Sequence, residues 1–436
     1  MRRLLIAATI VAALAIGGCG SSSDDDGSGG GADGGKVKVT FWHGQNDLTQ
    51  RAYERLVDEF NASHPGIEVD ANSGGVLADE MLTKLTAGLA GGSYPDVAYV
   101  FGSDLANIAR SDKVQDLTEA VADPAWRWDD FFPGERDAAT VDGRVRAVPA
   151  LADNLGIIYN KRLFADAGVP EPSADWTWDD FRQVAKQLTD ADKGQFGFSW
   201  PGAGGEDTTW RLWPMLWQQG GEILDADGRR AAFASPAGVD ALSLVGEMAT
   251  EDKSVFVDSD PNGERAIRLF QNGKLGMIEA GPWVLPDIIQ ARVDYGTQRL
   301  PGFDGDHTTI AGSDNWVLFD NGEERARAAQ EFVQWLTAQR QDVALARAIQ
   351  TLPLRRSTAE SPQYRRIAAE IPGTEVFALS LDTARARPSL EVYPEISKAV
   401  GEAVVAVLLG RSSAQDALTA AAQRADGVLA GAAAGG

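Results

Sequence analysis

Strand-like and helix-like runs alternate along residues 36–101 of this chain. Val37, Val39 and Phe41 alternate with polar residues, which predicts a strand, and two more strand-like runs follow at residues 67–69 and 96–101. The runs between them carry apolar residues at helical spacing. An order of strand, helix, strand, helix and strand predicts a parallel sheet with right-handed crossovers.

A polar loop follows each of these three predicted strands. In open α/β sheets, ligands bind beyond the carboxyl ends of the strands, so the three loops should converge on one rim. Asp104 has an alternative role as the N-cap of the helix that follows it. The loop residues that we expect to contact a ligand are His43, Gln45, Ser73, Gly74, Ser103 and Asp104.

A later stretch, residues 265–283, reads as a helix, a glycine stop at Gly273, a short buried strand and a turn. Pro282 fits the first turn of a further helix, where its missing N–H costs nothing. Gly281 and Trp283 then stand at the carboxyl end of a strand, which predicts a ligand-facing position. The alternative is that Trp283 turns inward and packs in the core.

Tryptophan is the most informative residue type, with twelve in the chain. An indole face suits the C–H face of a sugar ring, and nearby polar groups suit its hydroxyls. Trp210, Trp213 and Trp217 share a predicted helix face after a glycine-rich loop. We expect Trp210 and Trp213 to contact the ligand and Trp217 to be core, although any tryptophan can simply be a large core residue.

Further polar candidates lie in segments that break predicted strands. Asp153 and Asn154 lie between two strand-like runs and are either site residues or ordinary turn residues. Asn315 and Trp316 lie in a strand-like run at residues 310–319. The guanidinium of Arg355 has hydrogen-bond donors in one plane, which suits vicinal hydroxyls or a carboxylate. The alternative is that Arg355 is a surface charge.

Residues 1–18 have a basic start, an apolar run and two glycines, which predicts a secretory signal too short to span a membrane comfortably. Cys19, the only cysteine, follows directly in a segment that resembles a bacterial lipoprotein box, so we expect it to be lipidated. A small core thiol is the alternative. Residues 19–35 are rich in Gly, Ser and Asp and predict a flexible tether.

The composition bounds the remaining possibilities. A net charge of −23 argues against nucleic acid and anionic lipid as partners. Three histidines without metal-ligand spacing predict no metal, and without a P-loop or a GxSxG elbow we expect no cofactor and no enzyme activity. The four hundred or so residues after the tether exceed one core, which predicts two lobes.

Five short motifs, in this order, resemble those of the extracellular solute-binding proteins, family 1, of ABC importers, especially the sugar and maltose-type binders. The resemblance covers residues 37–409. The motifs are GSYPDV at residues 92–97, YNKRLF at 159–164 followed by AGV at 167–169, TWDDF at 177–181, FQNGKLGMIEAGPW at 270–283 and LPLR at 352–355.

This resemblance implies an α/β fold of two lobes, the maltose-binding-protein-like type II periplasmic-binding-protein fold, each lobe a mainly parallel sheet flanked by helices. It implies that a sugar is captured between the lobes by hinge closure and delivered to an ABC permease. It also implies that the protein is a monomer, exported and lipid-anchored at the outer face of the cytoplasmic membrane. One alternative is that the same fold binds a glycerol-phosphate ester. The other is that the protein is a secreted carbohydrate-active enzyme. The expected lobes are residues 36–149 with 312–354, and residues 150–311 with 355–430.

Overall fold

The computed structural model describes residues 35–76, 78–260 and 263–435 of the chain. The predicted signal peptide, Cys19 and nearly all of the predicted tether lie outside these residues. Residues 36–436 form one compact unit. Within the described residues, no helix is both long enough and apolar enough to cross a membrane.

A five-stranded sheet, in the order β2-β1-β3-β13-β6, organises the first part of the fold. The strands β1 (Val37–Trp42), β2 (Ile67–Asn72) and β3 (Val97–Phe101) are parallel, as the sequence predicted. β13 (Asp314–Leu318) runs antiparallel to β3 and to β6 (Val148–Leu151). This return strand places Asp314 opposite Phe101 and Leu151, beside the polar loop that follows β3.

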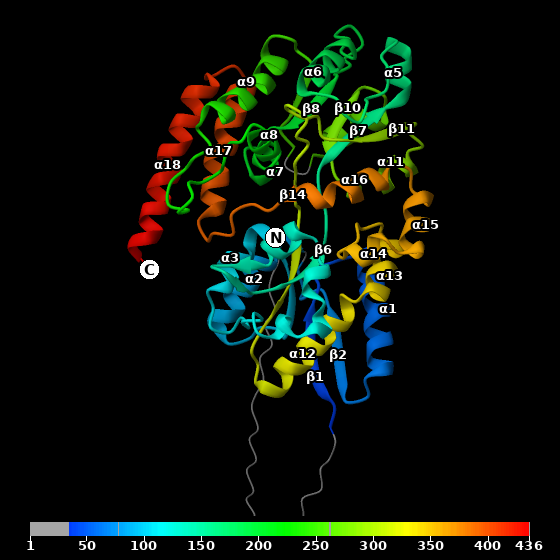
Figure 1. Cartoon of the computed structure of the whole chain (residues 1–436), viewed down its shortest axis with the longest axis vertical. Helices are drawn as coiled ribbons and strands as arrows, with labels where there is room; N and C mark the ends of the chain where they lie inside the picture. Colours follow the sequence, from blue (N-terminus) through cyan, green and yellow to red (C-terminus); the bar gives the residue numbers. More distant parts are fainter. Residues whose placement is uncertain (1–34, 77, 261–262, 436) are drawn as a thin grey trace, which may run out of the picture. The chain divides into compact units, whose positions relative to one another are not determined.

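Helices cover this first sheet because their apolar residues recur on one face. α1 (Asp47–Ser63) buries Tyr53, Leu56, Val57 and Phe60, while α12 (Glu323–Leu336) buries Phe332 and Val333. α2 (Ala78–Gly91) makes the crossover from β2 to β3. Figure 1 shows α1 and α12 beside β1 and β2.

A second sheet, β10-β7-β11, is antiparallel, unlike the mainly parallel second-lobe sheet that we expected. β10 (Met277–Ala280) and β11 (Tyr295–Arg299) flank β7 (Gly156–Asn160) and both run opposite to it. The reason is the connection: α11 (Leu285–Gln290) returns the chain so that β10 and β11 are parallel to each other, with β7 inserted between them. The separate pair β8 (Phe198–Pro201) and β9 (Val255–Asp258) is parallel.

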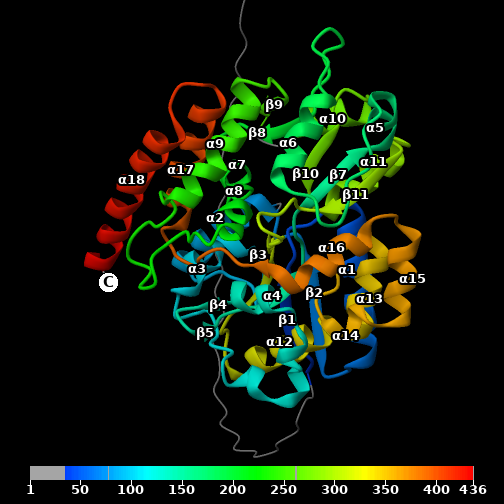
Figure 2. The ribbon, with the colours of Figure 1, turned by 45° about the horizontal axis from the view of Figure 1, so that its top comes forward.

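Helix α9 and the last two helices of the chain pack together over a second core. α9 (Pro236–Thr250), α17 (Tyr393–Leu408) and α18 (Ala414–Gly435) lie side by side in Figures 1 and 2 and contact one another. α6 (Trp178–Gln187) borders the same core and begins with the predicted capping box, in which Thr177 and Asp180 bond each other's main chain.

Shorter elements complete the described fold. The helices are α3 (Leu105–Ala109), α4 (Pro133–Ala138), α5 (Lys161–Ala167), α7 (Glu206–Thr209), α8 (Leu212–Gln218), α10 (Glu264–Gln271), α13 (Gln339–Ile349), α14 (Arg356–Ala359), α15 (Pro362–Glu370) and α16 (Thr374–Ser380). Two 3₁₀ turns matter below, η1 (Gly102–Asp104) and η5 (Pro282–Val284). The short strands are β4 (Thr140–Val141), β5 (Arg144–Val145), β12 (Thr309–Ile310) and β14 (Ala384–Arg385).

The predicted lobe boundary at residues 354 and 355 stays a prediction. In the structure, α14 and α15 contact α13, which belongs to the segment that we assigned to the first lobe. The next helix, α16, contacts β11 of the second sheet, and β14 then pairs with β12. These contacts favour a crossing near α16 rather than at Arg355.

Candidate functional site

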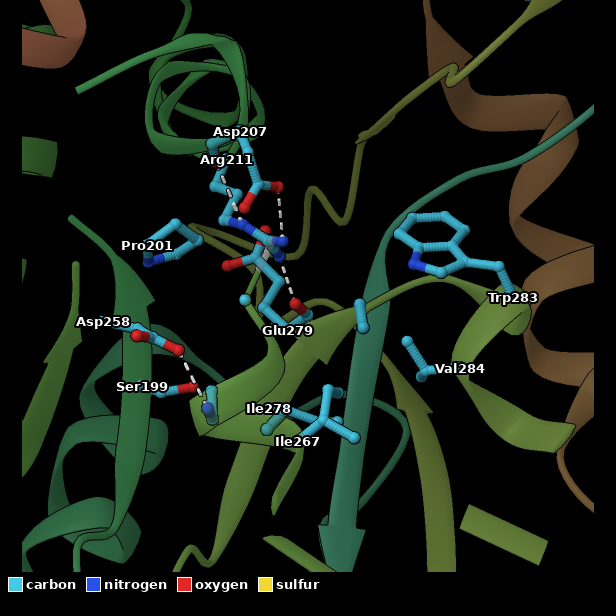
Figure 3. Close-up of a pocket in the computed structure, with 13 residues that line it drawn as sticks. Ser199, Pro201, Asp207, Arg211, Asp258, Ile267, Ile278, Glu279, Trp283 and Val284 are labelled. Carbon is cyan, nitrogen blue, oxygen red and sulfur yellow. Dashed lines mark hydrogen bonds and ion pairs between the residues drawn. The ribbon is translucent and has the colours of Figure 1, made fainter. Parts of the chain in front are cut away.

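Two indoles stack at the edge of the second sheet. The ring centroids of Trp210 and Trp283 lie 6.1 Å apart, with 29° between the ring planes. Trp283 in η5 is 44% exposed and Trp210 is 8% exposed, so one indole faces solvent and the other supports it. A Cβ at Gly281 would lie 1.8 Å from the Trp283 ring, so the absence of a side chain there lets the indole fold over the backbone. Trp283 is labelled in Figure 3.

Polar groups of several segments surround the buried indole of Trp210. A Cβ at Gly312 would lie 3.2 Å from both the Trp210 ring and the Cβ of Asp153, so these three residues adjoin. The Arg387 guanidinium lies over the Trp210 ring, 5.3 Å from its centroid. The pair of indoles therefore borders the segments that connect the first and second sheets.

Three carboxyl groups gather beside this pair. Asp314 begins β13 and accepts a hydrogen bond from the Tyr99 hydroxyl on the neighbouring β3. Burial raises the pKa of Asp314 to about 7, and it raises the pKa of Glu135 on α4 to about 8, an effect to which the charge of Asp314 adds. Burial, and then the charges of Asp314 and Glu135, raise the pKa of Asp153 well above its ordinary value. We call Asp153, Asp314 and Glu135 the acidic cluster.

The Arg387 guanidinium is near enough to oppose the rise in the pKa of Glu135 and Asp314. Arg387 donates to Glu206 at 2.6 Å, and Glu206 also accepts from the hydroxyls of Tyr393 and Ser397. Glu206 opens α7 directly after the glycine-rich loop at residues 202–205. The donors of Arg387 are thus partly committed to the protein, while its charge still reaches Asp314.

Several buried polar atoms without a hydrogen-bond partner in the described structure belong to the acidic cluster or to residues of the segments around it, and others lie elsewhere. Buried polar groups in native proteins are nearly always paired, so such atoms call for a ligand or water. Ser313 lies close enough to lower the pKa of Glu135, but the two side chains do not meet hydrogen-bond geometry. The atoms concerned are His43 Nε2, the Tyr53 hydroxyl, both Glu135 carboxylate oxygens, Asn154 Oδ1, Ser313 Oγ and both amide atoms of Asn315.

The predicted loop residues of the first sheet lie in three places. His43 is fully buried, burial lowers its pKa, and its Nδ1 accepts a hydrogen bond from the main-chain N–H of Gln45 at 3.0 Å. Ser73 and Gly74 form the turn after β2, where Gly74 packs against Trp42. Ser103 and Asp104 of η1 line a cavity of about 340 Å³, together with Glu206, Tyr393 and Ser397.

Three predicted site residues lie inside the protein instead, and we remove them from the site. Trp213 is fully buried and its indole N–H donates to Tyr393 at 2.9 Å. Trp316 is 1% exposed and packs against Phe41, Tyr53 and Tyr99 in the first core. The prediction failed for both because an aromatic side chain in a helix or strand carries the same sequence signal whether it faces the core or a ligand.

Arg355 is the third correction. Its side chain is 3% exposed and donates to the carbonyl oxygens of Thr337, Trp126 and Arg127 at 2.6–3.2 Å. Its guanidinium also lies 3.8 Å from the centroid of the Phe131 ring. These hydrogen bonds occupy the guanidinium donors that we had assigned to a ligand. Arg355 therefore links separate segments of the protein to one another.

Sequence reasoning missed five residues of the site, namely Tyr99, Glu135, Glu206, Asp314 and Arg387. Asp314 lies in the strand-like run at residues 310–319, and a carboxylate at the start of this strand, next to the predicted rim, is a readable signal. Glu206 follows a glycine-rich loop at a helix start, which is also a readable signal. Glu135 and Arg387 come to the site only through tertiary packing, and no local pattern marks them.

Residues 46–342 match the family described as bacterial extracellular solute-binding protein, and the chain belongs to this family. The crystal structure of the cyclic alpha-maltosyl-1,6-maltose binding protein from Arthrobacter globiformis is similar, with a TM-score of 0.82 and 28% identity over 91% of this chain and 99% of that one.

Two further similarities extend the comparison. UgpB from Mycobacterium tuberculosis, solved with glycerophosphocholine, has a TM-score of 0.79 and 21% identity, covering 91% of this chain and 99% of that one, and shows the fold. The maltotriose-binding protein of Pyrococcus abyssi is 22% identical over 316 residues, 70% of this chain and 64% of that protein. The fold is therefore the two-lobe, maltose-binding-protein-like fold that the sequence motifs implied.

Within the described residues, no group of three or more His, Cys, Asp or Glu side chains is placed to hold a metal ion.

Proposed function

We propose that this protein is the substrate-binding component of an ABC importer and that it captures a sugar in the site described above. The single observation that carries this proposal is the stacked pair of Trp210 and Trp283 beside the acidic cluster. The relative from Arthrobacter globiformis, which binds a cyclic maltosyl-maltose, supports the same ligand class.

The chemistry of a sugar fits these groups. The exposed Trp283 indole offers an apolar face for the C–H side of a pyranose ring. Carboxylates, amides and hydroxyls without partners offer the acceptors and donors that a fringe of hydroxyls needs. The proposed contact residues are His43, Gln45, Ser73, Gly74, Tyr99, Ser103, Asp104, Glu135, Asp153, Asn154, Glu206, Trp210, Gly281, Trp283, Asp314, Asn315 and Arg387.

In this account, the lobes close on the sugar about the connecting segments near Asn154 and Ala311, which already pair across a β-bridge. The closed form then delivers the sugar to the permease subunits. We propose no catalytic step, and a secreted carbohydrate-active enzyme stays the alternative of another class. Cleavage products from incubation with oligosaccharides would overturn the proposal.

A glycerol-phosphate ester is the second candidate ligand, because UgpB, a structural neighbour, was solved with glycerophosphocholine. A phosphate needs free cationic or main-chain N–H donors. Here the acidic cluster faces the site, and Arg387 donates to Glu206. This charge arrangement favours a neutral or basic ligand over an anion.

The location outside the membrane and the lipid anchor at Cys19 also belong to the proposal, together with a monomeric state. The support is the apolar run at residues 4–16 followed by Cys19. Expression of the wild-type chain and of Cys19→Ala with a labelled fatty acid tests the anchor. Label on the wild type alone is expected, and equal labelling would refute lipidation at Cys19.

A thermal-shift screen over mono-, di- and oligosaccharides tests the ligand class. A bound sugar raises the melting temperature because it stabilises the folded state by RT ln(1 + [L]/Kd). A shift with at least one sugar is expected. A shift with glycerophosphocholine and with no sugar would favour the second candidate.

A further inference from the structure

A separate cavity of about 170 Å³ lies beside Trp283 in the second lobe. Strands β8, β9 and β10, helices α7 and α10, the turn η5 and Arg211 before α8 contribute its lining, and most of the lining residues are labelled in Figure 3. Trp283 itself lines the cavity, and Asp207 accepts hydrogen bonds both from the Trp210 indole at 3.3 Å and from Arg211 at 2.7 Å. The cavity is therefore connected to the stacked indoles through shared residues.

Glu279 is the unusual group in this cavity. It lies on β10, is 4% exposed, and neither carboxylate oxygen has a hydrogen-bond partner in the described part of the chain. Figure 3 shows its side chain rising from the strand toward Arg211. Leaving a buried acceptor unpaired is costly, so its position in the wall of a cavity points to a ligand that donates hydrogen bonds.

The other charged groups of the cavity are already engaged. Arg211 donates to the main-chain oxygens of Asp207 and Glu279 as well as to the Asp207 carboxylate. Both carboxylate oxygens of Asp258 accept main-chain N–H bonds, at 2.8 and 3.0 Å. The cavity thus has three carboxyl groups and one guanidinium, and the hydrogen bonds of that guanidinium are already made. Hydrogen-bond acceptors therefore outnumber the free donors, and negative charge exceeds positive charge.

We propose that this cavity is a side subsite that receives a protonated amino group of the bound saccharide, with Glu279 as the group that recognises it. The ligand class is then an amino sugar, or an oligosaccharide that contains one. This inference rests on the proposed function, and it adds the chemical identity of one substituent. An ammonium group brings three donors and a positive charge, which matches the free acceptors of Glu279.

The protonation of Glu279 supports the pairing. Burial raises its pKa to about 8; the charge of Arg211 opposes this effect and that of Asp207 adds to it. At pH 7 the side chain therefore carries a proton in the free protein. An ammonium ion at hydrogen-bond distance favours the carboxylate, so its arrival should release up to about one proton.

The test uses calorimetric titration of the whole protein with glucosamine and its β-1,4-linked oligomers, the N-acetylated counterparts and maltotriose. We expect the amine forms to bind about tenfold or more tightly than the acetylated forms, because acetylation removes the charge. Glu279→Gln, which keeps the shape, should lose this preference. The exposed residue Glu251 supplies the matched control, Glu251→Gln, which should keep it.

A second measurement needs no variant. Titration of the wild type in two buffers of different ionisation enthalpy should give a release of up to about one proton for the amine ligand and none for the acetylated one. Binding of neutral sugars without any preference for the amine, or without proton release, would overturn the subsite and leave the proposed function standing. If none of the saccharides binds, the proposed function itself fails.

Discussion

Trp283 lies over the backbone of Gly281, and the missing side chain of that glycine is what gives the indole its place. A Cβ on Gly281 would meet the Trp283 ring at 1.8 Å and the main-chain oxygen of Asn154 at 2.6 Å. The φ angle of Gly281 is −100°, so space and not backbone conformation requires glycine. Gly281 therefore determines both where the Trp283 indole lies and how close it is to the connecting segment at Asn154.

Replacement of Gly281 by alanine should displace the Trp283 indole. We expect sugar affinity to fall about tenfold or more and the free energy of unfolding to fall by about 1–3 kcal/mol, as in other overpacked sites. Gly66→Ala is the control, because nothing lies within 4 Å of a Cβ at that position. Calorimetric titration and urea unfolding measure the two effects; unchanged affinity would remove Gly281 from the site.

Trp283→Ala should weaken sugar binding by about tenfold or more while the melting temperature changes little, because the indole is 44% exposed. The matched control is Trp335→Ala on α12, a partly buried indole that packs against Phe60. That variant should lose stability and keep its affinity. Intrinsic fluorescence titration and thermal unfolding check both variants, and a Trp283 variant that loses stability but binds normally would make this residue part of the core.

Glu135 should make the folded state less stable as the pH rises. Its pKa in the folded protein is about 8, above its ordinary value near 4.5, so between these values the folded state holds a proton that the unfolded state has released. This contribution is present below about pH 4.5 and is lost as the pH rises through about 8. We expect Glu135 to contribute a loss of about 2–4 kcal/mol between pH 5 and 9.

Urea unfolding at several pH values checks this expectation. Glu135→Gln should reduce the slope by the part that Glu135 supplies, because Asp153, Asp314 and Glu279 also have raised pKa values and keep the rest. The exposed residue Glu119, replaced as Glu119→Gln, should leave the slope unchanged. Stability that rises with pH over this range in the wild type would contradict the burial of a protonated Glu135.

Arg355→Ala should destabilise the protein by about 3 kcal/mol, because it removes the donor from the buried carbonyl oxygens of Thr337 and Trp126. Sugar affinity, measured below the melting transition, should stay within about twofold of the wild type, because the guanidinium makes its contacts inside the first lobe. Arg366→Ala, at an exposed position on α15, serves as the control. A large loss of affinity with unchanged stability would restore Arg355 to the site.

The sequence predicted those parts of the fold that depend on local pattern. The alternation of Val37, Val39 and Phe41 and the helical spacing after it predicted β1, α1 and the parallel pairing of β1 with β2 and β3. The capping box at Thr177 and the turn at Gly281 were likewise readable. The strand, the helix, the capping box and the turn are decided by residues within a few positions of one another, and the parallel pairing follows from the order of strands and helices.

The parts that could not be predicted depend on contacts between distant segments. The insertion of β7 between β10 and β11 makes the second sheet antiparallel, and no local signal marks it. Asp314 and Glu135 become neighbours only after folding, and their raised pKa values arise from burial together. Arg355 and Trp213 have side chains that suit a ligand, but the packed core uses those same groups.

Calorimetric titration of the purified protein with a panel of saccharides, for the wild type and for Asp153→Asn with Asp314→Asn, tests the central claim most directly. We predict saturable binding of at least one saccharide by the wild type, and an affinity at least about tenfold lower in the double variant, because each substitution replaces an oxygen that can accept hydrogen bonds from the sugar hydroxyls with an NH₂ group that can only donate. An unchanged affinity in a folded double variant, or binding of a phosphate ester and of no saccharide, would contradict it.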